Sequence, residues 1–312
     1  MEKISFVIPC YCSSNTVESV VNEIEAAMKP RGDDYDHEII LVNDYSTDNT
    51  EYVIMQLCKY NSKVKGLSFS RNFGQHSAVM AGFSCATGHY IVNLDDDGQT
   101  PVDHVFHLLD KIEEGYDIVF ARYNELTRRN IIRRVGTHIK ETMNHYLLGK
   151  PNNIVFNSFF IARKFVIDEV LNYKNPYPYL GGLLIRATTN IANVEVPHRP
   201  RMHGKSTYTI TKLIRIMLNE FTSFSVKPLR IASVIGIIFS FIGFVSAIFV
   251  VINKIVKPDV STGWSSLISV LLFIGGIQMI IMGLIGEYIG RIYEEVKERP
   301  MYIIAERIDG EN

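Results

Sequence analysis

The sequence predicts an α/β domain with a mainly parallel sheet, followed by two membrane-spanning helices. Short apolar runs alternate with segments of helical periodicity over roughly the first 120 residues. The apolar runs are nearly continuous, which is typical of strands buried on both faces of a parallel sheet. Two long stretches without a charged side chain, 231–252 and 265–286, follow in the C-terminal third. Each is long enough for a helix that crosses a bilayer.

The first four expected strands each end at a group of polar residues. The expected strands are 4–9, 38–43, 64–69, 90–94 and 117–121. Two helices are predicted by apolar residues at helical spacing: Val17, Val20, Val21, Ile24 and Met28 in the first, and Val105, Leu108, Leu109 and Ile112 in the second. Asn15 and Glu18 have the spacing of a capping box for the first helix. In such sheets ligands bind at the carboxyl ends of the strands, so we expect the site in these polar groups.

Composition excludes several classes of function. The formal net charge of −1 does not favour nucleic-acid binding. The four cysteines form no CxxC pair, and reduced thiols suit a cytosolic domain. There is no GxGxxG after the first strand and no GxxxxGK[ST], so a dinucleotide or P-loop site is not supported. Residues 1–20 lack the pattern of a signal peptide.

Three adjacent aspartates, Asp95, Asp96 and Asp97, follow the expected strand at 90–94. Oxygen ligands of this kind suit Mg²⁺ or Mn²⁺, which often link a protein to phosphate oxygens. The alternative is a solvated turn that caps a helix, a common role for aspartate. Asp44 and Asp48 at the neighbouring strand end favour the metal site.

Charges around the apolar stretches predict the topology. Basic residues lie outside both ends, at Lys227, Arg230, Arg291, Lys297 and Arg299, although two lysines also lie in the link between the stretches. The positive-inside rule places both outer ends in the cytoplasm. We therefore expect a cytosolic domain at 1–202, a connector at 203–230, two transmembrane helices within 231–290, and a cytosolic tail at 291–312.

Two basic segments leave alternatives open. The connector forms either a helix on the membrane surface or a core helix of the α/β domain. The stretch 128–140, with arginines among apolar residues, is either an amphipathic helix at the lipid headgroups or a solvated cationic helix. The membrane interpretation is favoured for 128–140, because two spans tether the domain to a bilayer.

Five sequence blocks occur in an order that identifies a family. They are VIPCY, VNDYSTDNT, SRNFGQHSAVMAGFSCATG, LDDDGQTP and GEYIGRIYEEVKERP. With two C-terminal apolar stretches, the chain resembles the family-2 glycosyltransferases of GT-A fold, specifically the polyprenyl-phosphate glycosyltransferases similar to dolichol-phosphate mannose synthase and the bactoprenol glucosyltransferases. The resemblance covers nearly the whole chain.

The resemblance implies a role for individual positions. Asp95 and Asp97 match the ends of the DxD motif that holds Mg²⁺ or Mn²⁺ on the nucleotide diphosphate, and Gln99 matches a glutamine that completes the coordination. The nucleotide is expected at Pro9, Tyr11, Asp44, Arg71 and Asp96. The segment RMHGKSTY resembles an element that handles phosphate near the membrane, with Arg201, Lys205, Ser206 and Tyr208 at the acceptor phosphate. The expected catalytic residues are Asp95, Asp97, Arg201 and Lys205.

The chain departs from the family pattern at informative positions. The family often has YNE where this chain has Tyr11-Cys12-Ser13. Tyr45 replaces the usual glycine of the NDGS loop, so we expect a different turn there. Ser158 stands where relatives have an aspartate that has been proposed as the catalytic base. A polyprenyl phosphate is ionised near pH 7 and attacks without a base, so transfer to it survives this change.

The resemblance implies a multi-pass enzyme of the inner cell membrane, with its catalytic domain on the cytoplasmic face. It would move a sugar, with inversion, from a nucleotide donor, a UDP-sugar first of all, to undecaprenyl phosphate for modification of cell-envelope glycans. Relatives with this hairpin assemble into oligomers, so a homo-oligomer is an open expectation. Two alternatives are a polysaccharide-extending transferase, whose usual QxxRW element is missing here, and a non-catalytic scaffold, which would have lost the metal ligands.

Overall fold

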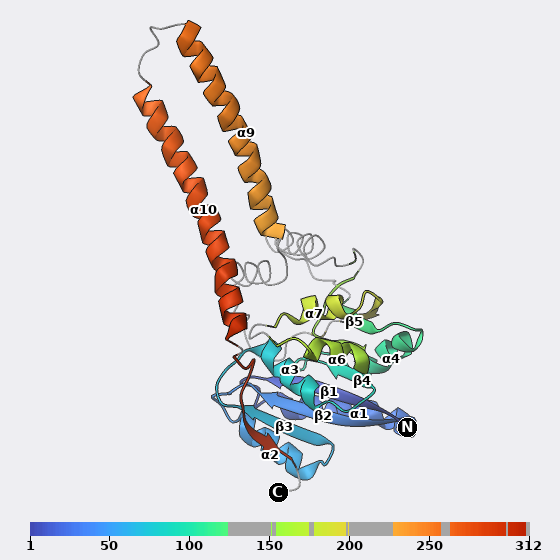
Figure 1. Ribbon diagram of the computed structural model, residues 1–312. Coiled ribbons are helices and arrows are strands. Elements are labelled where there is room, and N and C mark those ends of the chain that lie inside the picture. The colour runs from blue at the N-terminus through green and yellow to red at the C-terminus, as the bar shows by residue number, and fades with distance from the viewer. Residues whose placement is uncertain are drawn as a thin grey trace. The chain divides into compact units, whose positions relative to one another are not determined.

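A computed structural model describes residues 1–123, 151, 154–174, 178–197, 199, 227–256, 263–297 and 299–309 (Figure 1). The chain divides into two compact units. The first combines Met1–Tyr208 with Glu298–Asn312, and the second is Thr209–Lys297. The basic stretch 128–140 and most of the expected connector lie outside the described residues.

The first unit is built on one eight-stranded mixed sheet with the order β7-β5-β6-β4-β1-β2-β3-β8. β1 pairs in parallel with β2 and β4, β2 with β3, and β5 with β7. β6 runs antiparallel to both β4 and β5. The bounds are β1 Glu2–Cys10, β2 Tyr35–Asn43, β3 Val64–Phe69, β4 Tyr90–Asn93, β5 Ile118–Tyr123, β6 Phe160–Arg163, β7 Ile191–Val196 and β8 Ile304–Ile308. The mainly parallel sheet predicted from the sequence is confirmed.

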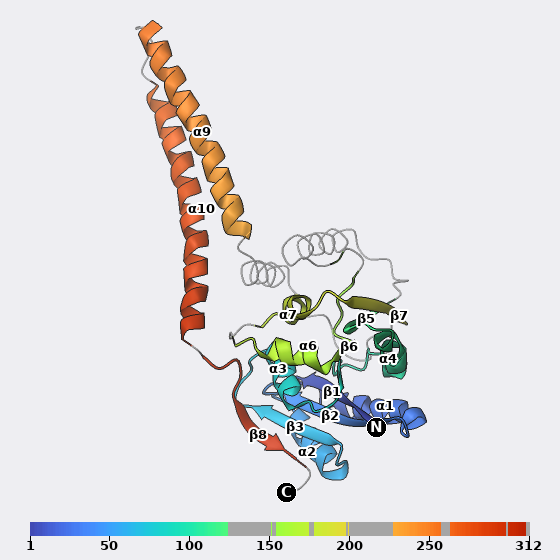
Figure 2. The ribbon, with the colours of Figure 1, turned by 45° about the vertical axis from the view of Figure 1, so that its right-hand side comes forward.

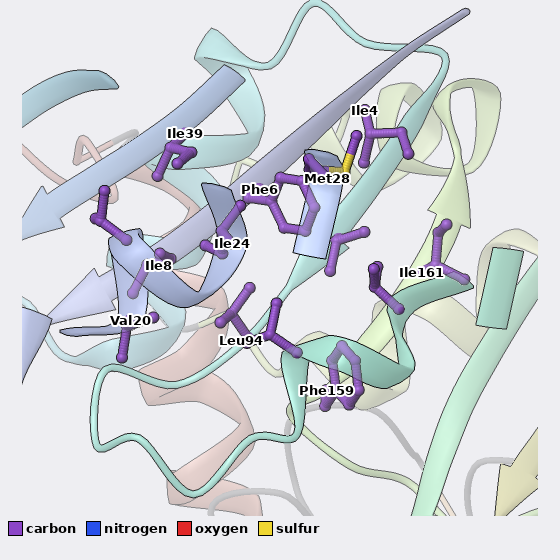
Figure 3. Close-up of a cluster of buried hydrophobic side chains, with 14 of the residues drawn as sticks. Ile4, Phe6, Ile8, Val20, Ile24, Met28, Ile39, Leu94, Phe159 and Ile161 are labelled. Atoms are coloured by element: carbon purple, nitrogen blue, oxygen red, sulfur yellow. The ribbon is translucent and has the colours of Figure 1, made fainter. Parts of the chain in front are cut away.

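Helices cover both faces of this sheet. Among the described residues, the helices of this unit are α1 Val17–Met28, α2 Thr50–Tyr60, α3 Gln75–Cys85, α4 Val105–Glu113, α6 Lys164–Leu171 and α7 Leu180–Ala187, with 3₁₀ turns at Lys29–Arg31 and Val102–His104. Side chains of β1 alternate between the faces: Phe6 and Ile8 belong to a core with α1, and Figure 3 shows them beside Val20 and Ile24. Val7 points to the other face, against α3.

The contact between β1 and α3 is close enough to require a glycine. A Cβ atom on Gly82 of α3 would lie 2.3 Å from Cγ1 of Val7 and 3.3 Å from Cγ2 of Val42. The backbone of α3 therefore lies directly on the sheet, and the fully buried Ala78 and Ala81 in the same helix fit this close approach.

The final strand, β8, comes from the far end of the chain. It runs antiparallel to β3 and pairs Gly66 with Ile308 and Ser68 with Glu306. Figures 1 and 2 show this segment along the outer edge of β3. Residues 291–312, which we expected only as a tail, thus include the end of a helix and an edge strand of the sheet.

The second unit contains two long helices, α9 Lys227–Val256 and α10 Trp264–Val296, which lie side by side in both views (Figures 1 and 2). Phe239 and Phe273 bring their ring centroids to 6.0 Å across the pair. Among the described residues, α10 is apolar and long enough to cross a membrane at Phe273–Gly290, whereas α9 holds a shorter apolar segment, Gly236–Val245. Large apolar side chains on both helices are exposed in the isolated chain, which calls for an apolar environment.

Candidate functional site

The candidate site lies in the loops that follow β1, β2, β3 and β4. The register pairs Cys10 with Asn43 and Val7 with Asn93, so these strands end beside one another. Backbone hydrogen bonds continue past the strand ends, from the Asp44 amide to the Cys10 carbonyl at 2.9 Å and from the Leu94 amide to the Val7 carbonyl at 3.2 Å. This edge is where the sequence placed the polar segments.

Asp95 is held by two side chains from other parts of the chain. Gln75, the first residue of α3, donates a 2.8 Å hydrogen bond from Nε2 to one carboxylate oxygen, and the Ser158 hydroxyl donates to the other. The side-chain amide of Asn93 in turn donates to the Ser158 carbonyl at 2.6 Å. Burial, together with the charges of Asp97 and Asp96, raises the pKa of Asp95 to about 6, although the hydrogen bonds from Ser158 and Gln75 lower it.

The other residues of the aspartate loop have separate partners. An Asp96 carboxylate oxygen accepts a 3.0 Å hydrogen bond from the Tyr11 backbone amide, and an Asp97 carboxylate oxygen accepts one of 3.0 Å from the Gln99 backbone amide. Burial also raises the pKa of Asp96, against the hydrogen bond from Tyr11. The predicted Asp95, Asp97 and Gln99 therefore share one short loop.

The donor chemistry of this loop fits a divalent cation. Two carboxylates and a side-chain amide offer the oxygen ligands that Mg²⁺ and Mn²⁺ prefer. Burial and, to a smaller extent, the neighbouring carboxylate charges raise the pKa of Asp95, and a bound cation would lower it. In the part of the chain that the structure describes, no three His, Cys, Asp or Glu side chains are grouped for a metal ion. The metal site stays a prediction.

Asp44 fixes the loop that contains Arg71. The Phe73 and Gly74 amides donate to its two carboxylate oxygens at 2.7 and 2.9 Å, and the Asn72 side chain donates to its carbonyl at 3.1 Å. Burial raises the pKa of Asp44, while the two amide hydrogen bonds lower it. The Arg71 guanidinium lies over the Phe73 ring, 4.6 Å from its centroid.

Pro9, Tyr11 and Tyr45 differ in exposure. Pro9 is buried in β1 opposite Val42, whereas Tyr11 and Tyr45 expose 54% and 53% of their surface. We expected a different turn at Tyr45, since it replaces a glycine. Tyr45 nevertheless has φ 57°, the left-handed conformation that glycine adopts without strain. The backbone at Tyr45 thus has a conformation that a glycine would also adopt, and the expected difference from the turn in relatives stays a prediction.

Four predicted residues, Arg201, Lys205, Ser206 and Tyr208, lie outside the described residues. Nearby Arg199 is described, and its guanidinium joins Glu23 of α1 and Asp103, with both N–O distances 2.6 Å.

Sequence reasoning missed Gln75 as a hydrogen-bond partner of Asp95. It lies within the SRNFGQH block, twenty positions before Asp95, and the hydrogen-bonding side chain has no periodic signature. The glycine before it, Gly74, was a local signal in the sequence, since its φ of 92° at the start of α3 is a conformation that favours glycine.

A sheet of this topology, with carboxylates in the loops after its parallel strands, defines a GT-A domain. The chain belongs to glycosyl transferase family 2, whose model matches residues 5–171. The model of the GtrB C-terminal hairpin matches residues 227–292, which include most of α9 and α10.

Similar proteins align over almost the whole chain. The uncharacterized glycosyltransferase YkcC of Bacillus subtilis is 32% identical over 312 residues, covering 99% of this chain and 95% of its own. An undecaprenyl-phosphate 4-deoxy-4-formamido-L-arabinose transferase of Klebsiella pneumoniae is 31% identical over 307 residues, covering 97% and 93%.

Crystal structures of glucosyl-3-phosphoglycerate synthase from Mycobacterium tuberculosis share the fold. The complex with phosphoglyceric acid has a TM-score of 0.54 at 21% identity, covering 72% of this chain and 80% of that one. The complex with Mn²⁺, UDP-glucose and phosphoglyceric acid has a TM-score of 0.53 at 20% identity, covering 71% and 79%. The likeness shows the fold.

Proposed function

We propose that this protein is a membrane glycosyltransferase that moves a sugar from a nucleotide donor, a UDP-sugar, to undecaprenyl phosphate. The observation that carries the proposal is the joining of two parts in one chain. One is a family-2 domain whose strand-end loop holds Asp95, Asp96 and Asp97, and the other is a GtrB-type hairpin. The Klebsiella relative that aligns with both parts is named as an undecaprenyl-phosphate transferase.

The donor would bind across the loops at the carboxyl edge of the sheet. Tyr11 and Arg71 are exposed there, and Asp44 holds the loop of Arg71 through the Phe73 and Gly74 amides. Asp95, Asp97 and Gln99 would hold Mg²⁺ or Mn²⁺, which neutralises charge on the diphosphate leaving group when bound. Glucosyl-3-phosphoglycerate synthase, which shares the fold, binds Mn²⁺ together with UDP-glucose, and this supports the assignment.

The acceptor needs orientation rather than activation. A phosphate monoester of a lipid is ionised near pH 7, so its oxygen attacks the anomeric carbon without first losing a proton to a base. Ser158, hydrogen-bonded to Asp95, occupies the position of the base proposed in relatives and has no basic group to offer. A single displacement inverts the anomeric carbon. Arg201 and Lys205, with Ser206 and Tyr208, would orient the attacking phosphate.

The hairpin supports a reaction at a membrane. A polyprenyl acceptor keeps its phosphate at the interface, where a tethered domain meets it. Basic residues outside both apolar stretches favour an inner-membrane protein with a cytoplasmic catalytic domain. Nucleotide sugars are made in that compartment, which fits the same orientation.

The test is a transfer assay with the full-length protein purified in detergent. Undecaprenyl phosphate is incubated with radiolabelled nucleotide sugars, each with Mn²⁺, Mg²⁺ or EDTA, and label is counted after extraction into organic solvent. We expect metal-dependent label in the lipid fraction with one donor. If nucleotide binds but no donor labels the lipid, the acceptor assignment is wrong, and a glycan acceptor or a scaffold role takes its place.

A further inference from the structure

Tyr45 has a backbone conformation that its side chain does not favour. Its φ of 57° lies in the left-handed region, where a Cβ atom crowds the backbone and glycine is the usual residue. Its ring is not buried to offset that strain, since 53% of the residue is exposed. Residues with strained backbones are often found at binding sites, where the orientation of the side chain matters more than the energy cost of the strain.

The neighbours of Tyr45 connect it to the candidate donor site. It follows Asp44 at the end of β2, and the next residue, Ser46, accepts a 3.0 Å hydrogen bond from the Cys12 amide through its hydroxyl. Cys12 is left-handed as well, with φ 55°. A direct bridge thus joins the loops after β1 and β2, and each loop carries an exposed tyrosine next to the bridge.

The loop after β1 is joined in turn to the aspartates. The Tyr11 amide donates to the Asp96 carboxylate at 3.0 Å. One continuous set of hydrogen bonds therefore runs from the aspartate loop, through Tyr11 and Cys12, to Ser46 beside Tyr45. If the aspartate loop binds the diphosphate as proposed, two exposed aromatic rings next to it are suited to the remaining part of a nucleotide, its flat base.

We propose that Tyr45 contacts the base of the donor nucleotide and, with Tyr11, sets the affinity for the donor. A base stacks on an aromatic ring whatever its hydrogen-bonding edge, because every base has a π face. This inference rests on the proposed function in that a nucleotide donor binds at this edge of the sheet. It adds a contact between the base and Tyr45, the residue that stands where the family usually has glycine.

The glycine-type φ of Tyr45 makes a sharp test possible. Tyr45→Gly removes the ring and relieves the backbone, so the variant folds and its melting temperature stays equal or rises. Tyr45→Phe keeps the ring, and Tyr60→Ala removes a tyrosine that is 80% exposed at the end of α2 as a matched control. Each full-length protein is titrated with UDP in the presence of Mn²⁺ by calorimetry.

We expect Tyr45→Gly to weaken UDP binding roughly tenfold or more, and Tyr45→Phe and Tyr60→Ala to leave it within about twofold. Ribose 5-diphosphate, which lacks the base, should bind Tyr45→Gly and the unchanged protein equally. Unchanged UDP binding by Tyr45→Gly would overturn the inference, as would an equal loss for ribose 5-diphosphate. UDP binding without transfer to lipid would overturn the proposed acceptor and leave the role of Tyr45 intact, whereas an unchanged protein that binds no nucleoside diphosphate would overturn both.

Discussion

The Ser158 hydroxyl donates a hydrogen bond to the Asp95 carboxylate. Ser158 precedes β6 and Asp95 follows β4, and these antiparallel strands bring the two residues together through the pairing of Asn93 with Phe160. Relatives with an aspartate at position 158 would place a further carboxylate beside the aspartate loop. This chain has a neutral donor there, which favours the ionised form of Asp95.

Ser158→Ala should weaken metal binding without unfolding the protein. Loss of the hydroxyl leaves one oxygen of Asp95 without its donor, so the carboxylate is no longer oriented, and we expect roughly tenfold weaker binding of Mn²⁺. Titration of Mn²⁺ followed by electron paramagnetic resonance measures this directly. Ser158→Thr retains the hydroxyl and is the control. Equal Mn²⁺ affinity in the alanine variant would show that Ser158 only supports the loop.

Asp97→Asn should abolish transfer while the fold persists. The amide matches the carboxylate in size but carries no charge, so metal is held less well on the leaving diphosphate. We expect turnover to fall by about 100-fold or more. Circular dichroism and the melting temperature should match those of the unchanged protein. Full activity in this variant would show that Asp97 is not a required metal ligand.

Glu38 predicts how stability depends on pH. It is 2% exposed, and its carboxylate accepts hydrogen bonds from Ser5 at 2.6 Å, from Thr87 at 2.7 and 2.8 Å, and from Lys3 and Lys65 at 3.0 and 2.9 Å. Burial alone would raise the pKa of Glu38, but these partners outweigh it and lower the pKa from 4.5 to about 2.

Since the folded pKa of Glu38 is lower than the unfolded one, its contribution is complete above about pH 4.5 and is lost as pH falls toward 2. Glu38→Gln should therefore lower the melting temperature at pH 7, where two lysines lose their partner. The difference between the variant and the unchanged protein should shrink between pH 4.5 and 2. Melting curves at a series of pH values measure both, and a difference that is independent of pH would contradict the assignment.

Tyr302 should influence donor binding from the sheet edge. Its ring stacks on that of Phe69, with 5.4 Å between the ring centroids and an angle of 10° between the ring planes. Phe69 in turn contacts Phe73 edge-on, with 5.6 Å between the centroids. Phe73 is held by Asp44 and lies under Arg71. Removing the Tyr302 ring loosens this stack.

We expect Tyr302→Ala to raise KM for the donor several-fold with little change in kcat, since the metal loop is not involved. Tyr302→Phe keeps the stack and loses only the hydrogen bond from the hydroxyl to Ser84, which measures 3.2 Å. Steady-state kinetics over a range of donor concentrations separates the two parameters. If Tyr302→Ala lowers kcat alone, the stack does not act through the donor loop.

Apolar periodicity predicted the central strands and the buried faces of α1 and α4, because those residues are determined by a local pattern. Val17, Val20, Val21, Ile24 and Met28 are all buried as expected. The predicted capping box failed: α1 has Thr16 at its N-cap and no side-chain cap, because the Thr16 and Val17 amides donate to the Ser13 carbonyl instead.

Features that depend on contacts between residues far apart in the chain were not predicted from the sequence. The segment of β8 contains Glu306 and Arg307, so it reads as a polar tail until β3 is placed beside it. Contacts such as Gln75 to Asp95 depend on how a helix start and a strand-end loop meet, which no spacing encodes. The metal site was predicted from the chemistry of three adjacent aspartates after a strand, whereas Gln99 and the nucleotide residues came from the family blocks.

The position of β8 has a consequence for the order of synthesis. The ribosome makes β1 to β7 first, then α9 and α10, and only afterwards the strand that pairs with β3. The edge of β3 is therefore unpaired while the hairpin is being made, a period in which an open strand edge can join the wrong partner. Completion of the sheet is thereby delayed until the hairpin has been synthesised.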